Sequence, residues 1–167
     1  FRIKFGIYLV IDFYTASETC DISQYAPDSS EFDMVLSLHG CDTLTDEAIR
    51  IAAECKADYI FVAPCCQHEM RYLWNDHPLS WISRYGLLEQ RLADTLTDGF
   101  RSLALEALGY RVNVIRFTEP DITPKNLIIQ AVKATKPDPN AKESLKRFMN
   151  EFGVHPKLAE YIKNKAQ

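Results

Sequence analysis

Apolar runs separated by polar turns predict alternating strands and helices in the first half of the chain. Residues 33–39 (DMVLSLH) and residues 58–63 (DYIFVA) are short apolar runs, which favours strands. Residues 45–55 predict a compact helix between them. A strand, a crossover helix and a second strand should give two parallel strands with a right-handed connection. Residues 3–14 are dense in β-branched and aromatic side chains and predict a further strand, or two short ones.

The second half begins with a helical pattern. Apolar residues recur at three- and four-residue steps over residues 78–108. We expect Gly86 to split this region into a short and a longer helix, and Gly109 to cap the longer one.

Two more strands and two helices complete the predicted order. Residues 111–118 and 126–132 look like strands joined by a short loop, so they should pair antiparallel. Residues 141–152 and 156–165 predict two amphipathic helices. The whole order predicts a three-layer α/β fold, mostly parallel with an antiparallel C-terminal strand pair. We expect an α/β domain over residues 1–135 and a helical extension over residues 136–167.

Composition narrows the class of protein. The chain has 167 residues, the size of one domain, and is 47% hydrophobic. Its net charge of -4 leaves no global basic field for nucleic acid, although a local basic patch stays open. No apolar run approaches the roughly 20 residues of a membrane span, and no signal-peptide cleavage pattern is present. The odd number of cysteines, 5, favours free thiols in a reducing cytoplasm.

Reactive side chains gather at the ends of the two predicted parallel strands. In an open parallel sheet, ligands bind beyond the carboxyl ends of the strands. The turns that follow these strands hold two histidines, three cysteines and an aspartate: His39, Cys41, Asp42, Cys65, Cys66 and His68. These turns are therefore where chemistry is expected.

The first turn allows both structural and catalytic interpretations. His39 is either a hydrogen-bonded structural residue or a base that titrates near neutrality. Asp42 likewise has either a structural role or a catalytic one. Thr45 is expected to cap the following helix, worth about 1 kcal/mol, with Asp46 and Glu47 complementing the helix dipole.

The second turn, residues 64–69, has four interpretations. Cys41, Cys65, Cys66 and His68 meet the ligand count of a zinc site, but adjacent cysteines usually point apart and the CxxC spacing is missing, so no metal is expected. A nucleophilic thiolate needs a lowered pKa, and the PCCQ string resembles the nucleophile turn of cytosine C5-methyltransferases, which follows a different strand. The remaining interpretations are a polar rim around a substrate, which would include Gln67, and cysteines packed as small hydrophobes.

Charged residues beyond the turns are also candidates. Arg91 and Arg101, with Lys125, either receive a phosphate or stay solvated on the surface. Asp98 lies three residues before Arg101 and should pair with it.

Ordered motifs connect these segments to a known family. The chain contains, in sequence order, LHGCDTLTDEA, APCCQHE, YGLLEQR, TDGFR, LGY and TPKNLII. These strings resemble a family of S-adenosylmethionine-dependent methyltransferases with the pattern LHACDTATD, PCCQHE, GLL..R, TD..R, LGY and TPKNLLIRA. The resemblance covers residues 31–134, with Gly40 and Leu44 in place of alanines. A weaker likeness extends to the tRNA 2'-O-methyltransferases that modify the acceptor stem, which share an HLCG-then-PCC arrangement.

The resemblance implies a Rossmann-like class I methyltransferase fold that transfers a methyl group from S-adenosylmethionine, with RNA as the favoured acceptor. The strands at residues 33 and 58 would be the fourth and fifth of seven, and the antiparallel pair the last two. It implies cofactor contacts by Asp12, Asp21, Ile22, Leu38, His39 and Gly40. It implies catalytic roles for His39, Asp42, Cys65, Cys66 and His68. It implies substrate contacts by Cys41, Gln67, Arg91, Arg101, Lys125 and Asn126.

The scarcity of glycine suggests an alternative to an active methyltransferase. The 6 glycines form no G-x-G-x-x-G, the loop that lets backbone approach a cofactor closely. The chain therefore resembles the C-terminal part of a methyltransferase. The alternative is a methyltransferase-like, non-catalytic module that has lost cofactor binding and acts through a partner.

Overall fold

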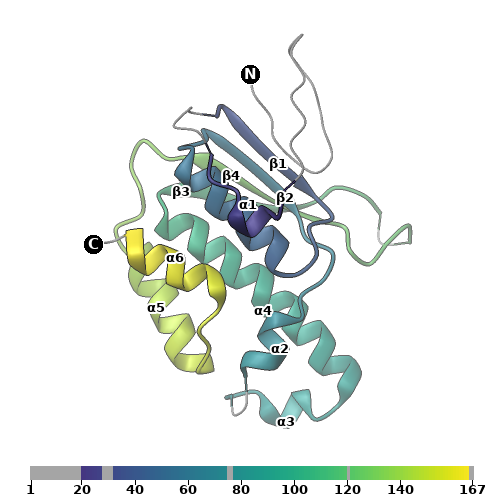
Figure 1. Ribbon diagram of the computed structural model, residues 1–167. Coiled ribbons are helices and arrows are strands. Elements are labelled where there is room, and N and C mark those ends of the chain that lie inside the picture. Colours follow the sequence, from purple (N-terminus) through teal and green to yellow (C-terminus); the bar gives the residue numbers. More distant parts are fainter. Residues whose placement is uncertain (1–19, 28–31, 75–76, 120, 166–167) are drawn as a thin grey trace.

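A single mixed sheet forms the centre of the fold (Figure 1). The computed structural model describes residues 20–27, 32–74, 77–119 and 121–165. The sheet has the order β1-β2-β4-β3. Its strands are β1 (Met34–Leu38), β2 (Tyr59–Ala63), β3 (Tyr110–Arg116) and β4 (Leu127–Lys133). β1 and β2 are parallel, and β4 runs antiparallel to both β2 and β3. The α/β class and both predicted strand pairs are thus confirmed.

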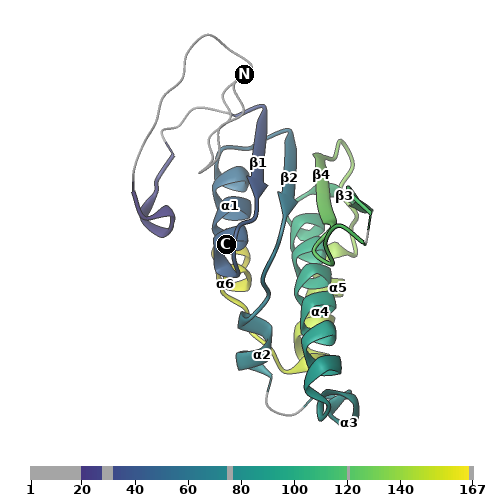
Figure 2. The same ribbon diagram turned by 90° about the vertical axis from the view of Figure 1, so that its right-hand side faces the viewer.

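The sheet has one well-buried face. Ile60 and Val62 of β2, and Ile129 and Ala131 of β4, are fully buried. Phe61, which points to the other face, is only half-buried. This alternation is the pattern of strands that pack on one side. Figure 2 shows the strands in front and the long helices behind them. In the described part of the chain the helices therefore cover one face, and the expected helical layer on the second face is not among these residues.

The helices follow the predicted order with two additions. They are η1 (Ile22–Gln24), α1 (Thr43–Glu54), α2 (Glu69–Leu73), α3 (Ser80–Ser83), α4 (Gly86–Ala107), α5 (Ala141–Phe152) and α6 (Lys157–Lys165). The split at Gly86 is confirmed, and so is the role of Gly109, which follows α4 with a φ of 96°. α2 and the single turn η1 were not predicted from the sequence.

One hydrophobic core joins the sheet to the C-terminal helices. Leu145 of α5 and Leu158 and Ile162 of α6 belong to the same buried cluster as Ile60 and Phe100. α5 packs on α4, while α6 packs on both α1 and α4. The segment after residue 135 thus contributes to the common core, and the domain boundary expected near that residue stays a prediction.

Two further predictions concern the N-terminal strand and membrane-spanning segments. The strand predicted at residues 3–14, together with Asp12, lies outside the described residues. Among the residues that the structure does describe, no helix combines the length and the apolar character needed to cross a membrane.

Candidate functional site

The turns after β1 and β2 are joined by backbone contacts. The N–H of His39 donates to the carbonyl of Ala63 at 3.0 Å, and the N–H of Asp42 donates to the carbonyl of Cys66 at 3.1 Å. Cys41 and Cys66 form an isolated parallel bridge. Parallel neighbours end at the same edge of a sheet, so the pairing of β1 with β2 brings these turns together. The candidate residues of the two turns therefore lie next to one another, and their roles stay predictions.

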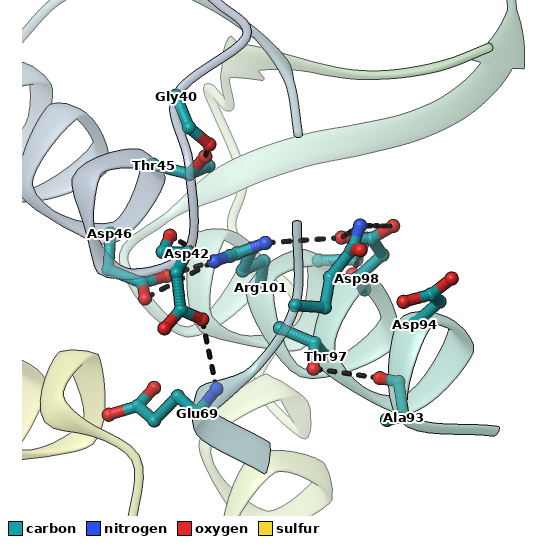
Figure 3. A network of polar contacts seen from close by, with 12 residues as sticks. Gly40, Asp42, Thr45, Asp46, Glu69, Ala93, Asp94, Thr97, Asp98 and Arg101 are labelled. Atoms are coloured by element: carbon teal, nitrogen blue, oxygen red, sulfur yellow. Dashed lines mark hydrogen bonds and ion pairs between the residues drawn. The ribbon is translucent and has the colours of Figure 1, made fainter. Parts of the chain in front are cut away.

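Asp42 holds the second turn in place. One carboxylate oxygen of Asp42 accepts hydrogen bonds from the N–H groups of His68 and Glu69, both at 2.9 Å. Figure 3 shows the bond from Glu69. These N–H groups lie at the start of α2, where a helix leaves its first donors unpaired. Asp42 thus caps a helix that begins 27 residues later in the chain. This explains why α2 forms, and it gives Asp42 a structural role beside the catalytic one that stays a prediction.

The backbone of the first turn is unusual at two residues. His39 and Asp42 have φ values of 57° and 49°, in the left-handed region that side chains other than glycine rarely adopt. The hydroxyl of Thr45 donates to the carbonyl of Gly40 at 2.6 Å. This corrects the expected capping role of Thr45, because Thr45 lies inside α1 and its hydroxyl donates back to the turn.

Three thiols converge on the outer side of the joined turns. The Sγ atoms of Cys41 and Cys65 are 3.3 Å apart, and those of Cys41 and Cys66 are 3.9 Å apart. All three Sγ atoms lie within 4.8 Å of one another. Cys41 is exposed, whereas Cys65 and Cys66 are half-buried. The expectation that the two adjacent cysteines point apart is therefore wrong.

Burial, followed by the adjacent thiols of Cys41 and Cys66, raises the pKa of Cys65 to about 12. A nucleophilic thiolate requires the opposite shift. The structure therefore removes the physical basis on which Cys65 was considered as a nucleophile.

A buried arginine lies beneath the turns, on the inner side. Arg101 of α4 is completely buried. Its Nε donates to Asp46 at 2.8 Å, and one terminal nitrogen donates to the carbonyl of Asp42 at 2.6 Å. The other terminal nitrogen contacts Asp98 at 3.3 Å, which confirms the predicted pairing along α4 (Figure 3). The expectation that Arg101 is a surface charge or contacts a substrate is corrected, because its donors are used inside the protein.

The network continues toward the loop between β3 and β4. The side-chain amide of Gln67 donates to Asp98 at 3.1 Å, and its oxygen accepts from Lys125 Nζ at 2.7 Å. Lys125 also pairs with Asp94 at 2.6 Å. Gln67 is buried, so its predicted substrate contact is corrected to a structural link between the second turn and α4. Lys125 is partly exposed and keeps its predicted role as a proposal.

Two carboxylates of this network have raised pKa values. Burial raises the pKa of Asp98, and the favourable effects of Arg101, Gln67 and Lys125 do not cancel it. Burial also raises the pKa of Glu69, whose carboxylate accepts from the N–H of Lys157 at 2.8 Å. Glu69 thereby ties α2 to the start of α6.

The remaining predicted residues divide by position. His39, His68 and Leu38 are exposed at the joined turns. Arg91 lies on α4 and is exposed, whereas Arg101 of the same helix is buried. Asn126 is buried and donates to the carbonyl of Thr118, so it organises its own loop and its predicted substrate contact is corrected.

Asp21 and Ile22, for which cofactor contacts were predicted, lie at the start of η1 and not at the joined turns. The carboxylate of Asp21 accepts from the N–H and hydroxyl of Ser23, and these bonds lower its pKa. The carbonyl of Ile22 accepts from Arg50, about two helical turns beyond the start of α1. The structure thus gives Asp21 a local contact with Ser23 and Ile22 a contact with α1, and the role of both residues toward a cofactor stays a proposal.

Sequence reasoning missed the carboxylates that anchor the network. Asp46 was assigned to the helix dipole, yet it is buried and forms the shortest ion pair with Arg101. Asp94 was not considered. The only sequence signal was the TD..R string that contains Asp98 and Arg101, and it does not name partners in other elements.

Comparison with known proteins adds one finding. Residues 11–72 match the model of a family described as a methyltransferase domain. The matched segment ends in α2 and includes both joined turns. No curated protein and no solved structure matches the chain. The match supports a methyltransferase relationship for the part of the chain that holds the candidate site.

Proposed function

We propose that this protein transfers a methyl group from S-adenosylmethionine to an acceptor at the joined turns of β1 and β2. The observation that carries the proposal is that both turns fall inside the segment similar to a methyltransferase domain. The sheet supports it: a parallel pair followed by an antiparallel pair agrees with a class I arrangement in which β1 and β2 are the fourth and fifth strands. Rossmann-like topology is part of this proposal.

The chemistry asks mainly for positioning. An acceptor lone pair forms a bond to the methyl carbon while the bond from that carbon to the sulfonium sulfur breaks, and the sulfide leaves. The donor is already activated, so the protein orients the reactants and accepts the acceptor's proton where there is one. In the proposed site Leu38, His39 and Gly40 contact the donor. His39 or Asp42 would take the proton, and Cys41, Cys66 and His68 would border the acceptor.

RNA is the acceptor that the surface favours. Tyr72 of α2, Trp81 of α3 and Tyr85 just before α4 are among the most exposed large side chains. Arg84 lies over the ring of Tyr85, 4.8 Å from its centroid. These elements extend beyond the carboxyl ends of β1 and β2 (Figure 2). Unpaired bases stack on exposed aromatic rings and arginine planes, so this surface is suited to hold a nucleotide next to the turns.

Calorimetry with S-adenosylmethionine on the whole chain tests donor binding. The variant Leu38→Arg places a charge at the end of β1 and is expected to weaken binding more than tenfold. Val114→Arg is the matched control, because Val114 is also an exposed strand residue but lies on β3. Absence of binding at millimolar donor, or equal loss in both variants, would contradict donor binding by this chain.

Methyl transfer from a radiolabelled donor to separate RNA, protein and small-molecule fractions tests the acceptor. We expect label in RNA. Trp81→Ala should reduce RNA binding about 5- to 150-fold, the loss of one stacked base at roughly 1–3 kcal/mol. Tyr59→Ala is the control, because Tyr59 is an exposed aromatic residue at the start of β2, at the opposite edge. Label confined to protein would exclude RNA while leaving donor binding intact.

A further inference from the structure

The three thiols have the geometry of a metal-binding set. A tetrahedral zinc ion with Zn–S bonds of about 2.3 Å separates its sulfur ligands by about 3.8 Å. The Sγ atom of Cys41 lies 3.3 Å from that of Cys65 and 3.9 Å from that of Cys66. The third separation is within 4.8 Å. The observed separations are therefore close to those that one tetrahedral ion requires.

We propose that Cys41, Cys65 and Cys66 together bind one Zn²⁺ ion, with the fourth coordination position open to water or a substrate atom. Soft thiolates select zinc, copper(I) and iron–sulfur clusters over magnesium or calcium. Zinc has no geometric preference from d-electrons, so it tolerates unequal sulfur positions. Three protein ligands with an open fourth place is the pattern of reactive zinc sites, and the exposure of Cys41 leaves this side accessible.

Hydrogen bonds hold the backbone around the three thiols in position. The Asp42 N–H bond to Cys66 and the Cys41–Cys66 bridge hold the two turns at a set separation. The Asp42 carboxylate binds the N–H groups just after Cys66. Metal affinity is highest where ligands are held in position before the ion arrives. The thiols therefore do not depend on folding around the ion.

The zinc site shares Cys41 and Cys66 with the proposed border of the acceptor, but its test uses no methyl donor, so the two proposals can fail separately. The whole chain is reduced, stripped with a chelator and titrated with Zn²⁺ against a chromophoric competitor. We expect one zinc per chain. Cys41→Ser, Cys65→Ser and Cys66→Ser should each weaken binding by more than the roughly 10–100-fold caused by loss of an outer-sphere partner. Cys20→Ser is the control, because Cys20 is an exposed free thiol outside the cluster, and it should bind zinc as the unaltered chain does.

A second readout covers variants that fail to fold. In the unaltered chain, zinc should slow alkylation of Cys41, Cys65 and Cys66, followed residue by residue by mass spectrometry, without changing the rate at Cys20. Cobalt(II) in place of zinc should add the intense near-ultraviolet absorption of thiolate-to-metal charge transfer. Substoichiometric zinc in the reduced chain, or equal alkylation with and without zinc, would overturn the proposal. A Cys41–Cys65 disulfide in a chain that binds no zinc when reduced would overturn it and identify a redox pair instead.

Discussion

The joined turns carry two polar clusters that differ in how their groups are satisfied. On the outer side, the three thiols contact one another, and Cys41 also contacts the carbonyl of His39. On the inner side, Arg101 is buried and its donors reach two carboxylates and a carbonyl (Figure 3). The thiols come from the two turns, whereas the inner cluster joins the first turn and the start of α1 to α4. A group whose hydrogen bonds are all made inside the protein stabilises the fold. Accessible groups with unused hydrogen-bonding or ligand capacity remain available for a ligand.

The inner cluster also shows how the turns depend on α4. Arg101 pairs with Asp46 at the start of α1 and binds the Asp42 carbonyl in the first turn. Gln67, from the second turn, reaches the same helix through Asp98. The turns that carry the thiols are therefore supported by the buried ion pairs of Arg101. Substitutions in those ion pairs test the difference between the two clusters most directly.

The largest effect is expected from removing the buried guanidinium. Arg101→Ala leaves Asp46 and Asp98 buried without their cation, which typically costs 3–5 kcal/mol, so we expect about that loss in the free energy of unfolding. Urea denaturation measures it. Arg91→Ala on the same helix is the control, because Arg91 is exposed, and it should change stability by less than about 0.5 kcal/mol. Equal denaturation midpoints for the two variants would mean that the inner cluster does not stabilise the fold.

A smaller effect should follow from removing the link between the clusters. Asp42→Ala deprives the N–H groups of His68 and Glu69 of their acceptor, which should cost about 1–2 kcal/mol by analogy with a lost helix cap. Asp42→Asn keeps an acceptor oxygen and should lose less. Because Asp42 fixes the second turn, the alanine variant should also weaken zinc binding about 10–100-fold.

Asp58→Ala is the matched control for that measurement, since Asp58 is exposed and lies at the opposite edge of the sheet. It should leave zinc affinity unchanged and lower stability by less than about 0.5 kcal/mol. Unaltered zinc affinity in Asp42→Ala would show that the thiol cluster does not depend on the capped turn.

Local patterns explain which parts of this structure were predictable. The strands, α1, the split at Gly86 and the antiparallel pair each follow from residues close together in sequence. α2 has only five residues, and its cap comes from Asp42 in the other turn, so no local pattern announces it.

The same reasoning explains the corrections in the site. The carboxylate that forms the shorter ion pair with Arg101, Asp46, lies 55 residues away, whereas helix spacing points only to Asp98. Neighbouring side chains point apart within a strand, but Cys65 and Cys66 lie beyond the end of β2, where that alternation no longer applies. Residue types located the site, and contacts between distant segments decided each residue's role.

A smaller loss is expected from filling the space at Gly40. A Cβ atom there would lie 2.9 Å from the Ser37 hydroxyl and 3.0 Å from the Thr45 hydroxyl. Gly40→Ala should cost about 1 kcal/mol, the lower end of overpacking, because a serine hydroxyl can rotate away. Adding Ser37→Ala should recover part of the loss, and urea denaturation of the double mutant measures this coupling. Additive losses would place the strain elsewhere, and zinc binding should persist in both variants.

The smallest effect, and the one with a defined pH dependence, concerns Asp98. Burial raises its pKa, so folding favours the protonated carboxyl. The stability that this protonation contributes is complete below the unfolded pKa of about 3.9 and is lost as pH rises through the raised folded pKa. Asp98→Asn stays neutral at every pH and keeps an acceptor for Gln67. Its free energy of unfolding should match that of the unaltered chain in acid, and at neutral pH it should differ by less than about 1 kcal/mol, in favour of the variant.

Urea denaturation across the acid range checks this expectation, with Asp94→Asn as the control on the same helix. Asp94 is only partly buried and pairs with Lys125, so its substitution should lower stability slightly at neutral pH. An Asp98→Asn variant that is instead less stable than the unaltered chain at neutral pH would mean that ionised Asp98 stabilises the buried pair with Arg101. Two ionised carboxylates would then bind Arg101 in the inner cluster. This would strengthen its contrast with the outer cluster, whose thiols contact one another.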